Sequence, residues 1–85
     1  MLALWVATTL VAGPDRLPFD VTAFLDRRAQ CQHWSGEEPY DAERAKQIEV
    51  ALQKLHCDRL DADEAWLRRQ HARNMGVIKA LDADP

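Results

Sequence analysis

Two cysteines in a chain of only 85 residues are the feature that most constrains how this sequence can fold. Cys31 is followed two residues later by His33, and Cys57 is directly preceded by His56. A domain this small buries little apolar surface, and a covalent cross-link or a bound metal is a common source of extra stability. The cysteine pair therefore indicates either a disulfide or part of a metal site.

The first twelve residues, MLALWVATTLVA, contain no charged side chain. They are too few to span a bilayer, which takes about 20 residues, so we expect no stable membrane span. Their length suits the apolar region of a secretory signal, although no basic residue precedes them. The alternative is an N-terminal strand or helix packed on the core. We expect residues 1–14 to be this signal-like or N-terminal apolar segment, and residues 15–85 to form a single helical domain.

Composition and compartment narrow the class of protein. A hydrophobic content of 47% is typical of a folded domain. The net charge of −3, with acids and bases interleaved, disfavours nucleic acid as a partner, because such proteins present a basic face. Two cysteines in a small exported domain usually form a disulfide. We therefore predict a periplasmic or secreted bacterial protein that is stapled by a Cys31–Cys57 bridge.

The spacing of apolar residues predicts two longer helices. The first covers residues 21–33, with Asp20 as its N-cap, and Gly36 ends it by adopting the left-handed conformation. The second covers residues 41–56 and begins at Asp41, with apolar residues at steps of three and four along one side.

Two shorter helices are expected to follow a turn at residues 57–63. The third covers residues 64–73 and is capped by Asp61 or Asp63, and a short last helix follows Asn74. No strand pattern occurs outside the first segment. The predicted fold class is all-α, a small bundle of three helices plus a short C-terminal helix.

Simple antiparallel packing of the first two helices opposes the bridge. The second helix is about 24 Å long at 1.5 Å per residue, so Cys57 would lie at its far end from Cys31, whereas bridged Cα atoms lie within about 7 Å. We expect the loop after the first helix to carry the chain back along that helix, or the second helix to start late or bend.

A zinc site and two free buried cysteines are the alternatives to the disulfide. Two thiolates and two imidazoles are an adequate tetrahedral set, although C-x-H…H-C is not a common spacing. Adjacent ligands would also have difficulty pointing at one ion. The alternative ligands are Cys31, His33, His56 and Cys57; the favoured disulfide reading needs no cofactor.

The segment around HWSGEEPYD is the candidate binding region. Its acids, Glu37, Glu38 and Asp41, with His33, can be read as an acid–base cluster, but we expect them instead to form a charged cap before the helix start and a solvated loop. Trp34 and Tyr40 are expected to pack the loop on the core, with an exposed binding hot spot as the alternative. No signature of a catalytic site is present, and we predict no catalytic residue.

The third predicted helix is rich in arginine, in the stretch WLRRQHAR. Arg68, Arg69, Arg73 and His71 could form an anion-binding surface beside Trp66. The simpler interpretation is that bases in the later half of a helix complement its dipole while their stems cover apolar surface.

Residues 24–83, and most specifically the Cys-x-His-aromatic-x-Gly-Glu-x-Pro-Tyr-Asp segment at Cys31 to Asp41, resemble a group of small exported, largely uncharacterised proteobacterial proteins. A second cysteine, an arginine-rich helix and an apolar tail complete the similarity. The resemblance implies export and a shared role for loop residues, but no activity. The weak leader and His56 beside Cys57 depart from it. The implied loop residues are His33, Gly36, Glu37, Pro39, Tyr40 and Asp41.

The predicted function is that of a small periplasmic interaction protein without enzymatic activity, an inhibitor or immunity-type module whose protein partner is unknown. The alternatives are a metal-binding module and a weak hydrolase using Glu37 or Asp41. An apolar face left exposed by three small helices would allow a second copy to bind, so the oligomeric state is open. The predicted binding residues are His33, Trp34, Gly36, Glu37, Pro39, Tyr40 and Asp41.

Overall fold

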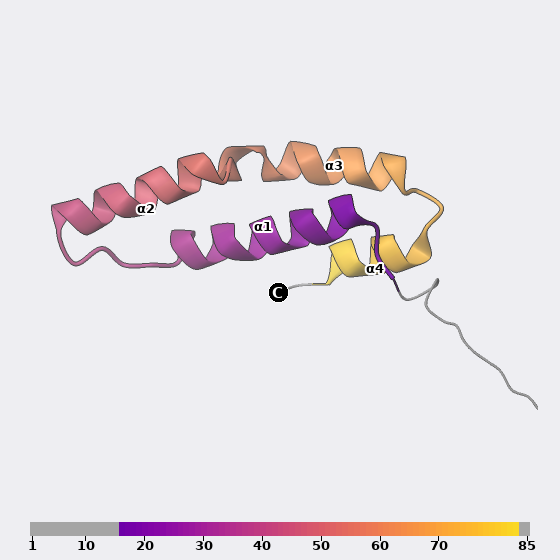
Figure 1. Cartoon of the computed structure of the whole chain (residues 1–85), viewed down its shortest axis with the longest axis horizontal. Helices are drawn as coiled ribbons and strands as arrows, with labels where there is room; N and C mark the ends of the chain where they lie inside the picture. Colours follow the sequence, from indigo (N-terminus) through magenta and orange to yellow (C-terminus); the bar gives the residue numbers. More distant parts are fainter. Residues whose placement is uncertain (1–15, 84–85) are drawn as a thin grey trace, which may run out of the picture.

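The computed structural model describes residues 16–83, and within that range it is all-α with no strand. This confirms the predicted fold class of three helices and a short C-terminal helix. A 3₁₀ turn, η2, joins the second and third helices (Figure 1). The elements are α1 (Phe19–Ser35), α2 (Ala42–Lys54), η2 (Cys57–Arg59), α3 (Leu60–Gln70) and α4 (Met75–Asp82).

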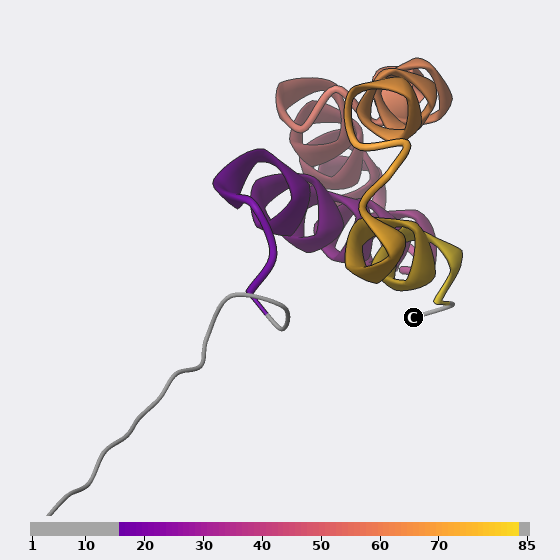
Figure 2. The same ribbon diagram turned by 90° about the vertical axis from the view of Figure 1, so that its right-hand side faces the viewer.

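The helices lie in two rows. Helices α2 and α3 follow one another along one side of α1, and α4 folds back beneath α3 to lie beside the start of α1 (Figure 1). Seen from the end, α1, α3 and α4 lie at the corners of a triangle (Figure 2). In residues 16–83, no helix is both long enough and apolar enough to cross a membrane.

The side chains of Asp41 and Asn74 cap the starts of α2 and α4. Asp41 precedes α2 and accepts a hydrogen bond from the Arg44 backbone N–H at 2.7 Å. Asn74 precedes α4 and accepts one from the Val77 N–H at 3.1 Å. Both side chains satisfy donors that a helix start leaves without a partner.

The predicted start of the first helix is wrong by two residues, because α1 begins at Phe19. Pro18 is the N-cap of α1, and its carbonyl accepts from the Val21 and Thr22 N–H groups, each at 3.1 Å. Asp20 therefore lies inside the first turn, where its carboxylate meets His71 at 3.2 Å. Proline is favourable here because a helix start needs no donor from that position.

The predicted end of the first helix is also corrected. Helix α1 continues to Ser35, and Gly36 has a φ of −87° rather than a left-handed conformation. Its N–H donates to the Gln32 carbonyl at 3.1 Å, and a Cβ at this position would lie 3.3 Å from that carbonyl oxygen. Glycine is used here for close backbone approach, not for positive φ.

The predicted cap of the third helix is wrong. Helix α3 begins at Leu60, so neither Asp61 nor Asp63 is its N-cap, and both lie in its first turn. Residues 57–59, the first part of the predicted turn, form the 3₁₀ helix η2, which leads directly into α3. Carboxylates in a first turn still favour the helix because they face its positive end.

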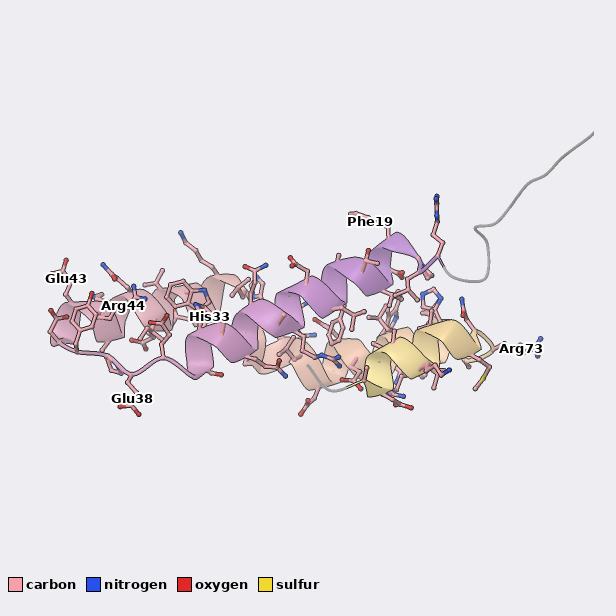
Figure 3. All side chains as sticks on the ribbon, turned by 90° about the horizontal axis from the view of Figure 1, so that it is seen from below. Phe19, His33, Glu38, Glu43, Arg44 and Arg73 are labelled. Atoms are coloured by element: carbon pink, nitrogen blue, oxygen red, sulfur yellow. A yellow bond between two sulfur atoms is a disulfide. The ribbon has the colours of Figure 1, made fainter. Side chains whose placement is uncertain are left out.

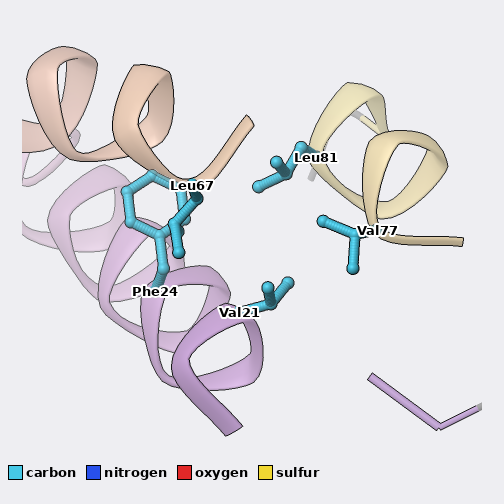
Figure 4. Packing of buried hydrophobic residues seen from close by; sticks show 5 residues of the cluster. All are labelled: Val21, Phe24, Leu67, Val77 and Leu81. Atoms are coloured by element: carbon cyan, nitrogen blue, oxygen red, sulfur yellow. The ribbon is translucent and has the colours of Figure 1, made fainter. Parts of the chain in front are cut away.

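The hydrophobic core joins α1, α3 and α4 (Figure 4). Helix α2 supplies none of its members and buries only Ile48. In α3 the buried residue is Leu67, and Trp66 beside it is half-exposed. The core residues are Val21, Phe24, Leu67, Val77 and Leu81.

Two arginines on α1 explain why its apolar stripe is interrupted. Arg28 donates to the carbonyls of Leu81 and Ala83, each at 3.0 Å, and so satisfies the C-terminal end of α4. Arg27 donates to the Asp63 carboxylate at 2.7 Å. Both guanidinium groups lie within 6 Å of the Phe24 ring, at 5.7 and 5.8 Å from its centroid. These charges hold α3 and α4 against α1.

The Cys31–Cys57 disulfide is present, with its Cα atoms 5.7 Å apart. The route that brings the cysteines together differs from both expected routes. Residues 36–41 carry the chain onward past the end of α1, and α2 then returns along that segment (Figure 1). The C-terminal end of α2, rather than its start, therefore meets the last turns of α1, and Cys57 arrives beside Cys31.

Candidate functional site

The predicted binding residues gather at one end of the molecule, around the loop between α1 and α2. Figure 3 shows His33, Glu38, Glu43 and Arg44 at this end, far from Phe19 and Arg73. His33 and Trp34 come from the last turn of α1, and Arg44 comes from the first turn of α2. The disulfide joins α1 to Cys57, just after α2, and so holds the C-terminal end of α2 beside α1.

Glu37 links the two helices that flank the loop. Its carboxylate accepts a hydrogen bond from Arg44 at 2.6 Å and lies 3.3 Å from His33 Nε2. The hydrogen bond to Glu37 raises the pKa of Arg44, partly opposed by burial. Arg44 was not among the predicted site residues, although a base three positions after Asp41 was visible in the sequence.

Aromatic contacts complete this network. The Arg44 guanidinium lies 5.2 Å from the centroid of the Trp34 ring, and the His33 and Trp34 rings meet edge to face at 5.7 Å. Trp34 is half-buried, and these contacts join it to Arg44 and His33. Since Asp41 also caps α2, both ends of the loop are held by directional contacts.

The loop tip, which we define as residues 38–40, lies outside this network and is exposed. Tyr40 has 80% of its surface exposed, so the expectation that it packs on the core is wrong and the alternative of an exposed aromatic is correct. The residues that hold the loop in place, Glu37, Arg44 and Trp34, are therefore different from the exposed residues 38–40 of the loop tip. A held loop that displays a tyrosine and a carboxylate is suited to contact a protein surface.

The ligand set of the zinc alternative is not assembled. Both sulfurs are joined in the disulfide, which leaves no thiolate for a metal. His33 is mostly exposed and faces Glu37, and no cluster of three His, Cys, Asp or Glu side chains suited to a metal occurs in residues 16–83. The acids of the loop likewise pair with Arg44 or point outward.

An open hollow of about 770 Å³ lies beside the disulfide. Its apolar walls include Leu52 and Leu60, and its polar walls include Glu49 and His56. Sequence reasoning did not find this hollow, because it depends on how α2 and α3 are placed against α1.

The predicted basic cluster of the third helix is divided by the fold. Arg68 pairs with Glu64 at 2.9 Å and with Asp82 at 2.7 Å, and these hydrogen bonds raise its pKa, with Asp82 contributing most. His71 faces Asp20. Only Arg69 and Arg73 of the predicted cluster lie exposed without an ion pair among residues 16–83.

No protein-family profile, curated protein or solved structure matches this sequence. The chemistry of the site is therefore argued from its geometry. The arrangement provides a fixed loop with an exposed aromatic and acidic tip, bound to the scaffold through Glu37, Arg44 and Trp34.

Proposed function

We propose that this protein is a small non-enzymatic interaction protein of the bacterial periplasm, which uses the loop tip to cover a site on a partner protein, as an inhibitor or immunity-type module does. The observation that carries the proposal is Tyr40, exposed on a loop that Glu37 and Arg44 hold in place. A loop ordered before binding loses less conformational entropy when the complex forms. Tyrosine is among the residues that most often supply binding free energy in interfaces.

The disulfide and the resemblance to exported proteins support the compartment. Disulfides persist in oxidising compartments such as the periplasm and are rare in the cytosol. The apolar residues 1–14 would supply the export signal; they lie outside the described residues.

The test is a binding experiment with matched variants of the full, disulfide-intact chain. A partner is captured from periplasmic extract, identified by mass spectrometry, purified and titrated by calorimetry against the wild type. We expect Tyr40→Ala to weaken binding by about tenfold or more, as for an interface hot spot. Val50→Ala, which truncates a partly exposed apolar residue on α2, is the control and should bind as the wild type does.

Two results would count against the proposal. A partner that binds Tyr40→Ala with unchanged affinity would place the interface elsewhere. Failure to recover any partner through the loop tip, also with a photo-crosslinking residue at position 40, would remove the interaction role assigned to it.

A further inference from the structure

The end of the molecule opposite the loop tip displays three large apolar side chains to solvent. Phe19 is 85% exposed, Trp66 is 49% exposed and Met75 is 71% exposed. They come from three different helices that meet around the core. Phe19 and Trp66 line one open hollow between α1 and α3, and Met75 lines a second at the turn between α3 and α4.

Two arginines share a hollow with Met75, and a third lies close to Phe19 in the sequence. Arg69 and Arg73 line the same hollow as Met75, and Arg16 lies three residues before Phe19. Within residues 16–83, four of the other five arginines form ion pairs with carboxylates, whereas these three and Arg59 of η2 form none. We call the surface made by these six residues the basic–apolar end: Arg16, Phe19, Trp66, Arg69, Arg73 and Met75.

The acids nearest this end cancel only part of its charge. Asp20 is 3.2 Å from His71, and Asp63 is 2.7 Å from Arg27. Asp63 is therefore paired with a charged base, whereas Asp20 beside a neutral imidazole keeps its negative charge. Three arginines against this one carboxylate leave the basic–apolar end with net positive charge beside exposed aromatic and thioether side chains, on a chain whose net charge is −3.

We infer that the basic–apolar end rests on an anionic phospholipid surface. Aromatic and aliphatic side chains insert at the boundary between headgroups and acyl chains, while neighbouring arginines bind lipid phosphates. The uncharged run of residues 1–12 joins the described part of the chain at Arg16, on this same end. The exposed apolar side chains and the junction of that run with the chain at Arg16 favour a lipid surface, and the positive charge favours an anionic one.

This inference does not rest on the proposed function, because it concerns the opposite end of the molecule. Figure 3 shows Phe19 and Arg73 at one end and Glu38 and Glu43 at the other. With the basic–apolar end on a membrane, the loop tip points away from the bilayer and stays open to a partner.

The first experiment measures co-sedimentation of the full chain with vesicles. Vesicles of phosphatidylcholine with phosphatidylglycerol are compared with vesicles of phosphatidylcholine alone. We expect binding to the anionic vesicles that weakens as salt is added, since exposed charges are screened. The paired variant Arg69→Gln with Arg73→Gln should lower the partition coefficient onto anionic vesicles by about 10- to 30-fold. Each arginine near an anionic surface raises that coefficient by about fivefold.

The matched control is Lys46→Gln with Lys54→Gln, which makes the same change of net charge on exposed positions of α2. It should bind nearly as the wild type does. An equal loss in both paired variants would mean that only net charge matters. No loss in either would mean that residues 1–12 bind alone. Either result, or no binding to anionic vesicles, would overturn the inference.

The second experiment reads orientation from the tryptophans. One variant keeps only Trp66, by Trp5→Phe and Trp34→Phe, and another keeps only Trp34, by Trp5→Phe and Trp66→Phe. Brominated phospholipid should quench the fluorescence of Trp66 and leave that of Trp34 unchanged. Equal quenching of both, or quenching of Trp34 alone, would overturn the inference. Circular-dichroism melts check that both variants are folded.

Discussion

His56 is the residue where the backbone conformation is most unusual. It alone has positive φ among residues 16–83, with φ 54° and ψ 48°. Its N–H donates to the Gln53 carbonyl at 3.0 Å and its carbonyl accepts from Arg27 at 3.3 Å. The next residue, Cys57, is tied to α1 by the disulfide. The left-handed conformation therefore turns the chain from α2 into η2 where the bridge requires it.

We predict that His56→Gly raises the free energy of unfolding by about 0.5–1 kcal/mol, because glycine adopts the left-handed conformation without the Cβ clash. His56→Ala keeps the clash and should give no such gain. Urea unfolding followed by circular dichroism measures both. A lower stability for the glycine variant would show that the imidazole itself stabilises this turn.

Glu37 is the residue on which the conformation of the loop depends. We predict that Glu37→Gln increases hydrogen exchange of the amides in residues 36–41 several-fold, because the charge that attracts Arg44 and His33 is lost. Global stability should change little, since partly exposed ion pairs contribute little. Glu38→Gln removes the same charge from an exposed position and should leave exchange unchanged. Equal exchange in both variants would mean that Trp34 packing alone holds the loop.

At the scale of elements, the helices differ in how much of the core they carry. Helix α4 has 8 residues, and it buries Val77 and Leu81 completely or nearly so. Helix α2 has 13 residues and buries only Ile48. Helix α2 is therefore held mainly by the disulfide and by contacts at its two ends, whereas α4 is held by the core.

This difference predicts unequal effects of removing the two N-caps. Asn74→Ala should lower the free energy of unfolding by about 1 kcal/mol, as the loss of a cap does, because unfolding of α4 opens the core. Asp41→Ala should mainly increase hydrogen exchange in the first turn of α2. Thermal melts and exchange mass spectrometry compare the two variants. A larger loss of global stability for Asp41→Ala would mean that α2 is part of the cooperative core.

At the scale of the whole molecule, the disulfide joins the loop end to the core end. It closes a segment with a sequence separation of 26 residues between two halves that share few buried side chains. We predict that replacing both cysteines by serine lowers the free energy of unfolding by about 3.5 kcal/mol, from the chain entropy that the bridge removes from the unfolded state.

Chemical denaturation with and without a reducing agent checks this prediction. The wild type should become less stable on reduction, and the double serine variant should not respond. A wild type that keeps its full stability when reduced would mean that helix packing alone brings α2 beside α1.

The sequence by itself determined the features that depend on residues within a turn or two of one another. The helical periods predict four helices near their observed positions, and the short polar side chains of Asp41 and Asn74 are visible as caps because their partners lie three residues away. The start of α3 was missed because η2 and α3 form against a bridge to a residue far away in the sequence. The pairing of the cysteines followed from their number and the size of the domain, but not their route.

The tertiary structure decided everything that depends on helix rotation and on which segments meet. It directed the loop past the end of α1, buried part of Trp34 while exposing Tyr40, and placed Arg28 on the carbonyls at the end of α4. It also divided the arginines of α3 between ion pairs and the basic–apolar end. Such contacts join residues 14 to 55 positions apart, and their free energies depend on distances that the local sequence does not fix.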